Sequence, residues 1–274
     1  MTTNTPNPMN ITASLWRHHY LIGQLVRRDV LLKYKGSYLG IGWSFLYPLL
    51  LLIAFTLVFG GVFGGRWKGG ESGGMHGLEL ALFIYCGLAV FTPFSEVIST
   101  APRLLLGNQN FVKKIIFPTE ILPLVSLLSA SIHGTAHIIL LLLAALLTGH
   151  SHTSMLLVPI VLLPVWLFTL GLAWLTTAAG AYVRDLAHGM PVLVQLLMFL
   201  SPVFYPLDSA PGFLRTLHAF NPLALAMEDM RRTVITGLPP DWNSWLFMLV
   251  IGLAFAALGY AFFVRCREEF ADVL

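Results

Sequence analysis

The amino-acid sequence predicts an all-α integral membrane protein with six transmembrane helices. Of its 274 residues, 57% are apolar and only 11% are charged, whereas a soluble domain has about 45–50% apolar and about 25% charged residues. Asp, Glu, Lys and Arg are absent from residues 36–65, 121–183, 186–207 and 242–264. These features exclude an ordinary soluble domain, and they exclude a disordered chain because disorder needs low hydrophobicity and high charge.

The charge-free stretches define the expected spans. A helix of about 20 residues crosses a hydrocarbon core of roughly 30 Å, so the stretch at 121–183 holds two spans. The first stretch has no small-residue cleavage site after it, so we do not expect a removable signal peptide. We place six helices in a transmembrane domain over residues 36–267, at about 40–63, 80–101, 121–147, 155–183, 190–207 and 242–264.

Basic residues predict the orientation. With both termini in the cytoplasm, the inside segments hold eleven of the sixteen Lys and Arg residues and the outside loops hold five. The positive-inside rule therefore favours two cytoplasmic termini, including a short tail at 268–274. The outside residues are Arg66, Lys68, Arg215, Arg231 and Arg232.

The cytoplasmic N-terminal segment, residues 1–35, contains an amphipathic pattern from residue 11 onward. Apolar and polar residues on two helical faces predict a helix lying in the membrane surface. It is either a positively charged topology anchor or a collar around an entry path. The apolar face holds Leu15, Ile22, Val26 and Val30, and the polar face holds Arg17, Gln24, Arg28 and Lys35.

The cytoplasmic loop after the second span predicts a short helix. Asn110 can cap it and Pro118 limits it, with Phe111 on one side and Lys113 or Lys114 on the other. Such a helix is either a docking element for a partner or a segment lying on the lipid surface.

An external helical hairpin is expected at residues 208–241. Asn221 as a cap, Pro222 at the first helical position and Gly237 past the end predict a helix over residues 222–236. A shorter helix is expected over residues 211–219. Leu223, Met227, Met230 and Val234 would share one face, and Glu228 with Arg232 would form an i,i+4 pair. The hairpin is either an exit gate or a lid that only packs over the bundle.

Several kinds of chemistry are not expected. The glycine-rich stretch 60–74 has Lys68 but no hydroxyl residue directly after it, so it is not a nucleotide-binding P-loop. Cys86 and Cys266 lie in different settings and predict no disulfide. Two histidine pairs have ligand-like spacing, but Asp, Glu and Cys are absent around them, so we expect no metal. These pairs are His133 with His137 and His150 with His152.

Glu96 is the intramembrane ionisable residue, and such residues point to functional sites. Snorkelling to the interface or capping also explains its position. Aromatic residues concentrate in the first and fifth spans, where rings suit the apolar faces of sugars, although Trp and Tyr also form interfacial belts. These residues are Trp43, Phe45, Tyr47, Phe199, Phe204 and Tyr205.

Together, several local strings resemble one family. Arg28-Asp29 and the run from Lys33-Tyr34-Lys35-Gly36 through Trp43 to Pro48 are similar to the entry of the first helix in permease subunits of ATP-binding-cassette exporters with type-2 membrane domains. The similarity is greatest to exporters of polysaccharide, O-antigen or teichoic acid. Further matching strings run from Phe117 to Pro123, Arg184 to Leu186, Ser201 to Pro206, and Asn221 to Leu223 with Arg231.

This resemblance implies a homodimer in the bacterial inner membrane that recruits two copies of a separate P-loop ATPase. ATP and Mg²⁺ would bind that partner, so this chain would carry no cofactor and would not be an enzyme. The first and fifth helices would line a path for a lipid-linked glycan, and the external hairpin would form a periplasmic gate. No nucleic acid is expected as a partner. Contacts with the ATPase would come from Arg103, Asn110, Phe111, Lys113, Lys114 and Phe117.

Alternatives remain open at this point. The same architecture suits a drug, a lipid or another small molecule as cargo. Outside this class, the chain could be an ion-coupled carrier acting alone, or a membrane-embedded enzyme that uses His133 and His137.

Overall fold

The computed structural model describes residues 16–58, 77–109, 117–207 and 210–270, and within these residues all regular structure is helical. The all-α fold expected from the sequence is therefore confirmed. The helices are α2 (His19–Lys33), α3 (Trp43–Leu57), α4 (Gly77–Thr100), α5 (Leu104–Gly107), α7 (Ile121–Leu147), α8 (Val158–Tyr182), α9 (Leu186–Leu200), α10 (Gly212–Ala219), α11 (Pro222–Val234) and α12 (Trp242–Cys266).

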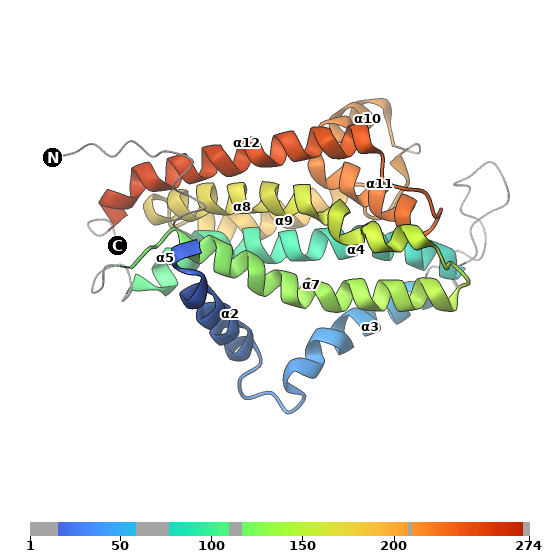
Figure 1. Cartoon of the computed structure of the whole chain (residues 1–274), viewed down its shortest axis with the longest axis horizontal. Helices are drawn as coiled ribbons and strands as arrows, with labels where there is room; N and C mark the ends of the chain where they lie inside the picture. Colours follow the sequence, from blue (N-terminus) through green and yellow to red (C-terminus); the bar gives the residue numbers. More distant parts are fainter. Residues whose placement is uncertain (1–15, 59–76, 110–116, 208–209, 271–274) are drawn as a thin grey trace.

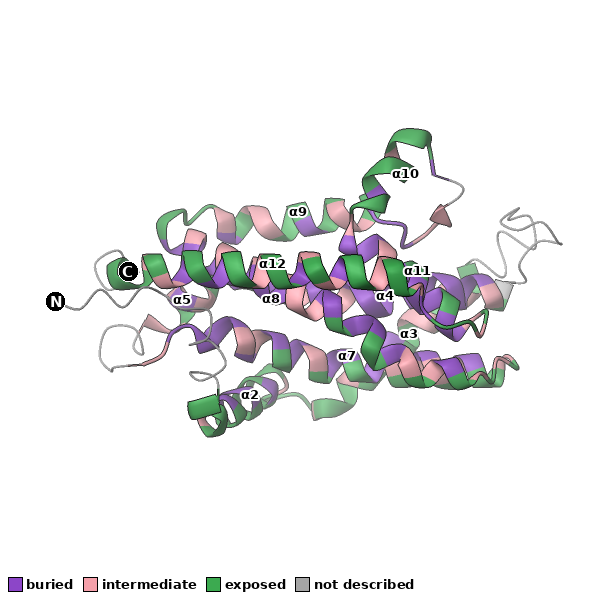
Figure 2. Cartoon of the chain, turned by 45° about the horizontal axis from the view of Figure 1, so that its top comes forward, coloured by how far each residue is buried: buried purple, intermediate pink, exposed green. Residues whose placement is uncertain are grey.

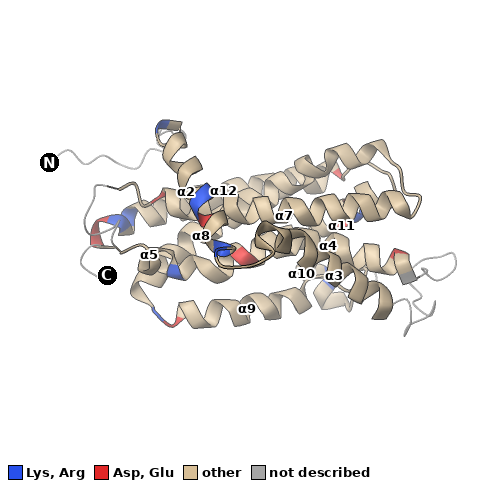
Figure 3. Cartoon of the chain, turned by 90° about the horizontal axis from the view of Figure 1, so that it is seen from below, with Lys and Arg blue, Asp and Glu red and all other residues tan. Residues whose placement is uncertain are grey.

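Five helical stretches in the described part of the chain are long and apolar enough to cross a membrane. They correspond to the first, second, third, fourth and sixth expected spans. Figure 3 shows these long helices almost free of charged residues. The five stretches are Gly40–Leu57, Leu78–Gly107, Ile121–Leu147, Thr153–Tyr182 and Trp242–Glu269.

The fifth expected span is shorter than the sequence predicted. It was placed at residues 190–207, but its helix, α9, ends at Leu200 after 15 residues. Ser201 has an extended backbone with ψ 151°, as expected for a residue that precedes a proline. Pro202 also lacks a backbone N–H, so it cannot continue the helical hydrogen bonding.

The helix α4 is the centre of the bundle. The long helices run along the same axis (Figure 1), and α4 contacts α3, α7, α8, α9 and α11. Figure 2 shows α4 largely in the buried colour. On its far side α8 packs against α12, where Gly171 and Gly259 bring the two backbones close together.

The helices α2 and α3 diverge from the bundle beside α7 (Figure 1). The apolar face of α2 packs on Ile121 and Val125 of α7, as the amphipathic pattern predicted. The buried side chains of this face are Ile22, Leu25, Val26 and Val30, whereas Leu15 lies outside the described residues. In contrast, α3 buries only Pro48 within the described chain.

Polar contacts join three segments at one end of the bundle, which we call the basic end (Arg103, Arg184 and Arg267). Arg267 Nη1 lies 3.4 Å from Glu120 Oε2 at the start of α7. Arg103 Nη2 donates to the carbonyl of Ala187, which belongs to α9, at 2.7 Å. These contacts place segments that were predicted on the same side of the membrane next to one another.

Candidate functional site

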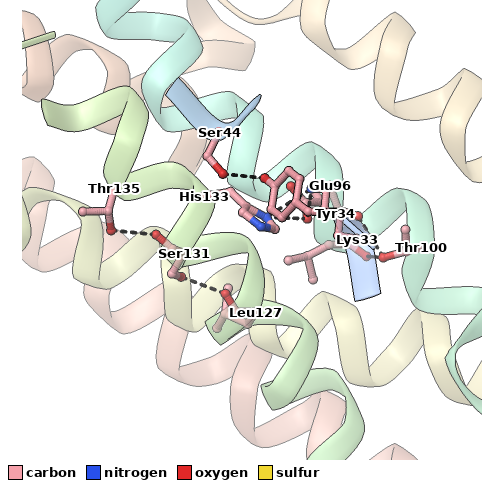
Figure 4. A network of polar contacts seen from close by, with 10 residues as sticks. Lys33, Tyr34, Ser44, Glu96, Thr100, Leu127, Ser131, His133 and Thr135 are labelled. Carbon is pink, nitrogen blue, oxygen red and sulfur yellow. Dashed lines mark hydrogen bonds and ion pairs between the residues drawn. The ribbon is translucent and has the colours of Figure 1, made fainter. Parts of the chain in front are cut away.

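A cavity of about 280 Å³ lies between α2, α3, α4 and α7, and we call it the polar cavity. Its wall combines charged, imidazole, hydroxyl and aromatic side chains, although the surrounding helices are apolar. Figure 4 shows how these side chains converge from separate helices. The lining residues are Lys33, Tyr34, Trp43, Ser44, Tyr47, Pro48, Thr92, Pro93, Glu96, Ala130, His133, Gly134 and His137.

Lys33 ties the end of α2 to two other helices. Its Nζ donates to Glu96 Oε1 of α4 at 2.8 Å and lies 3.1 Å from His133 Nδ1 of α7. The neighbouring residue Tyr34 shares a hydrogen bond of 2.5 Å with the hydroxyl of Ser44 on α3. The end of α2 is therefore connected to α3, α4 and α7 through polar groups.

His133 lies between the two charged groups of the pair. Its Nδ1 is 3.1 Å from Lys33 Nζ, which can only donate, and 3.2 Å from Glu96 Oε1, which can only accept, so the imidazole can pair with either group. The Nε2 atom of His133 is buried and has no hydrogen-bond partner among the residues that the structure describes. A buried polar atom without a partner costs free energy.

His137 forms the deeper part of the wall. Its Nδ1 lies 3.3 Å from the hydroxyl of Tyr85, whose ring stacks on it at 5.9 Å between centroids. Tyr47 approaches the same imidazole edge-on at 6.5 Å. Both histidines are thus held by protein groups. The described residues contain no group of three or more His, Cys, Asp or Glu side chains that would hold a metal.

The aromatic residues expected along the path separate into three places. Trp43 and Tyr47 line the polar cavity, and Phe45 is exposed on α3 outside it. Phe204 lies 5.9 Å from Phe199 between ring centroids and 6.3 Å from Phe55 of α3. Phe204, which follows the end of α9, therefore links α3 to α9 through its ring contacts.

Tyr205 does not belong to that aromatic cluster. Its hydroxyl lies 3.1 Å from His218 Nε2 of α10. His218 is fully buried, and its Nδ1 has no partner among the described residues. Tyr205 thus connects the segment after α9 to the hairpin instead of facing a path along α3.

The hairpin forms as the sequence indicated, with small differences at its ends. The Asn221 side chain accepts from the Leu223 N–H at 3.0 Å, and Pro222 starts α11. The helix ends at Val234, two residues before the expected end, and Gly237 has the positive φ of 73° that favours glycine. The apolar face is fully buried and consists of Leu223, Met227, Met230 and Val234.

The prediction that Glu228 pairs with Arg232 in α11 is wrong. Glu228 pairs with Arg231 at 3.3 Å. Arg232 donates instead to the carbonyl of Pro239 at 2.7 Å. Arg231 is only 3% exposed because it turns into the bundle. Its Nη2 donates to the carbonyls of Pro202 and Val203, and its Nε donates to that of Phe83. This side chain joins α11 to α4 and to the end of α9.

Asp229 is a buried carboxylate that the sequence reading did not single out. Its Oδ1 accepts from the Asp241 N–H at 2.9 Å, and its Oδ2 has no partner among the described residues. Burial raises the pKa of Asp229 to about 6. One signal pointed to it in advance, because Asp229 lies two residues before Arg231 on a helix with a buried face.

Only part of the expected partner-contact region is described. Arg103 is exposed at the basic end, where it also donates to Ala187, and Phe117 packs between the α2 face and α7. Asn110, Phe111, Lys113 and Lys114 lie outside the described residues. The basic residues of the interface helix, Arg17, Arg28 and Lys35, are all exposed.

Comparisons with known proteins place the chain in one family. Residues 20–235 match the family model described as ABC-2 type transporter. The chain is 25% identical to the O-antigen export system permease protein RfbA of Myxococcus xanthus, over 96% of this chain and 99% of that protein.

Two further relatives are similar in length. The RfbA protein of Klebsiella pneumoniae is 23% identical, over 93% of this chain and 95% of its own. The polysialic acid transport protein KpsM of Escherichia coli is 22% identical, over 89% of this chain and 92% of its own. With its membrane-spanning helices and a family match that covers most of its length, the chain is an integral membrane protein that belongs to the ABC-2 type transporter family.

Proposed function

We propose that this chain is the permease subunit of an ATP-driven exporter that moves a polysaccharide across the bacterial inner membrane. The observation that carries the proposal is the similarity over nearly the full length to relatives named as O-antigen export permeases and polysialic acid transport proteins. The cargo in this proposal is a glycan attached to a lipid.

The energy source in this proposal is a separate subunit. Two copies of a P-loop ATPase bind ATP and Mg²⁺ and attach to a homodimer of this chain. The basic end faces the cytoplasm, because basic residues favour that side, and both termini lie there. The ATPase contacts are Arg103 and Phe117 together with the loop residues between them, Asn110, Phe111, Lys113 and Lys114.

A glycan is too long to be enclosed in one alternating-access cavity. We therefore propose a continuous path between the two copies of the chain, lined by the aromatic residues of α3, by Phe199 of α9 and by Phe204 after it. The hairpin α10–α11 closes this path at the periplasmic side. ATP binding opens the path only to the extent that the ATPase contacts the open and closed forms differently.

Deletion of the encoding gene tests the function. The mutant should lose its surface polysaccharide, seen on a gel of extracted glycans, and a plasmid copy of the gene should restore it. Lipid-linked glycan should accumulate in the cytoplasm of the mutant. Normal surface polysaccharide together with loss of another exported compound would overturn the polysaccharide assignment.

The coupling assignment has its own test in the reconstituted complex with its ATPase. Phe111→Ala and Lys113→Ala should keep ATP turnover but lower export severalfold. Lys68→Ala, in the loop that the sequence predicts on the opposite side of the membrane, is the matched control and should export normally. Unchanged export by the two variants would remove these residues from the coupling role, and transport by the permease without any ATPase would eliminate the whole proposal.

A further inference from the structure

The polar cavity has a chemical character that the transport path alone does not require. It lies inside one copy of the chain, beneath the end of α2, and it combines three aromatic side chains with a set of hydrogen-bonding groups. The cavity is partly open, because the Lys33 and Glu96 side chains in its wall are 45% and 29% exposed. Its polar groups are therefore accessible to a ligand that forms hydrogen bonds.

The volume limits the size of that ligand. At about 280 Å³, the polar cavity is just below the roughly 300 Å³ at which pockets enclose drug-sized molecules. A single six-membered ring with its substituents fits this space, whereas an oligosaccharide does not. The ligand is thus one unit of a larger molecule or a small molecule of that size.

The charges of the cavity argue against a phosphate group. Lys33 is already paired with Glu96 at 2.8 Å, and the ionised carboxylate would repel an incoming anion. A neutral molecule with hydroxyl groups meets no such penalty. Hydroxyl groups both donate and accept, so they suit a wall that holds an ammonium, a carboxylate and imidazole groups.

The aromatic residues complete the match. Trp43 and Tyr47 of α3 line the cavity, and aromatic faces pack on the apolar C–H surface of a sugar ring. Glu96 supplies acceptor oxygens, and Tyr34 and Ser44 supply hydroxyl groups on the same side (Figure 4). Rings and hydrogen-bonding groups on neighbouring walls are what a pyranose, with its apolar faces and polar rim, would require.

We infer that the polar cavity is a binding site for one neutral sugar unit of the exported glycan. The inference rests on the proposed function and deepens it, because a site at the end of α2 would hold a sugar before the glycan enters the path between the two copies. His133 and Glu96 hydrogen-bond the hydroxyl groups, and Trp43 and Tyr47 pack on the ring. Lys33 orients both His133 and Glu96.

Saturation-transfer NMR on the purified permease tests the site, in a detergent without a sugar head group. The probes are glucose, galactose, mannose, rhamnose and N-acetylglucosamine, and inorganic pyrophosphate is the anionic comparison. At least one neutral sugar should give a signal that falls fivefold or more in Trp43→Leu and in His133→Phe. Trp242→Leu and His150→Phe, both outside the cavity, are the matched controls and should keep the full signal.

The outcomes are separable. Absence of a signal with every sugar, equal signals in all variants, or preferential binding of pyrophosphate that depends on Lys33 would overturn the site. If the binding test fails but the deletion strain loses its surface polysaccharide, only this inference fails and the transport function stands. If the deletion strain has normal surface polysaccharide, the proposed function fails whether or not the permease binds a sugar. Each variant must elute as a single species and unfold at the wild-type temperature, so that misfolding is not mistaken for lost binding.

Discussion

The guanidinium of Arg231 lies over the ring of Phe83, with 3.7 Å between Arg231 Cζ and the ring centroid. The same side chain donates to the carbonyl of Pro202 at 2.5 Å and to that of Phe83 at 3.3 Å. The planar fork of donors in arginine allows several such bonds at once. Hairpin, central helix and the end of α9 are therefore joined at one point, and a movement of α11 must displace the segment after α9 or break these bonds.

Replacing Arg231 should destabilise the protein strongly. Arg231→Met leaves buried carbonyls without a donor, which costs about 1–3 kcal/mol for such a group. We expect the midpoint of thermal unfolding in detergent to fall by about 5–10 °C, since 1 kcal/mol shifts it by about 2–4 °C in a chain of this size. The unfolding midpoint of Arg231→Lys should lie between those of the wild type and Arg231→Met, because lysine cannot reach all the carbonyls.

Arg232→Met is the matched control for this change. Arg232 is exposed and donates to a single carbonyl, that of Pro239. Its loss should shift the midpoint by no more than about 2 °C. Equal effects of the two substitutions would contradict the role given to Arg231.

The fold was predictable because the membrane imposes a simple rule on sequence. Apolar stretches without charge located five spans, and cap and proline residues located the start of α11 at Pro222. The error in the fifth span had a local signal as well. Ser201-Pro202 lies within the apolar stretch, and this proline ends the helix although the residues after it are still apolar.

The contacts of the site were less predictable, because they depend on how helices cross. Lys33 was read as one of several cytoplasmic cations, and only the packing of α2 on α7 brings it to Glu96 and His133. Arg231 faces the bundle because α11 is buried, so the i,i+4 rule for an exposed helix chose Arg232 wrongly. Helical periodicity gives the face of a residue but not the neighbour that this face meets.

Breaking the Lys33–Glu96 pair should loosen α2. Glu96→Gln removes an ion pair whose two side chains are 45% and 29% exposed, and solvent screening limits its contribution to about 1 kcal/mol. Opening of α2 should then increase about fivefold. Limited trypsin digestion measures this, through cleavage at Arg27 and Arg28 followed by mass spectrometry.

Glu268→Gln, near the C-terminus, should leave that cleavage rate unchanged. A reversed pair, Lys33→Glu with Glu96→Lys, should return the rate toward the wild type, whereas each reversal alone should increase it further. A reversed pair as open as the single reversals would show that the charge contact does not hold α2.

The close approach of α8 and α12 should not tolerate side chains. A methyl group on Gly259 would meet the backbone of Gly171, and one on Gly171 would meet the backbone of Phe255. Gly259→Ala or Gly171→Ala must separate two helices, at a cost of about 1–3 kcal/mol. We expect a lower yield of monodisperse protein in size-exclusion chromatography.

Gly189→Ala in α9 is the control for the glycine substitutions. A methyl group there meets no atom within 4 Å, and alanine favours the helix over glycine by up to about 1 kcal/mol. Its yield should equal or exceed that of the wild type. A similar loss at Gly189 would mean that helix packing is not the cause.

Asp229 should make the stability of the hairpin depend on pH. Burial raises its pKa from 3.8 to about 6, an effect increased by the charges of Asp241 and Glu228 and opposed by Arg232 and the Asp241 N–H. The folded protein therefore binds a proton that the unfolded chain releases, and the unfolding free energy falls as pH rises from about 4 to about 6. At about 1.4 kcal/mol per pKa unit, this contribution to the unfolding free energy is at most about 3 kcal/mol.

The Asp229→Asn side chain cannot ionise, but its carbonyl still accepts from the Asp241 N–H. Thermal unfolding between pH 4 and 7.5 should show a wild-type midpoint that falls relative to the Asn variant up to pH 6 and stays parallel above it. Parallel curves over the whole range would mean that Asp229 does not titrate there.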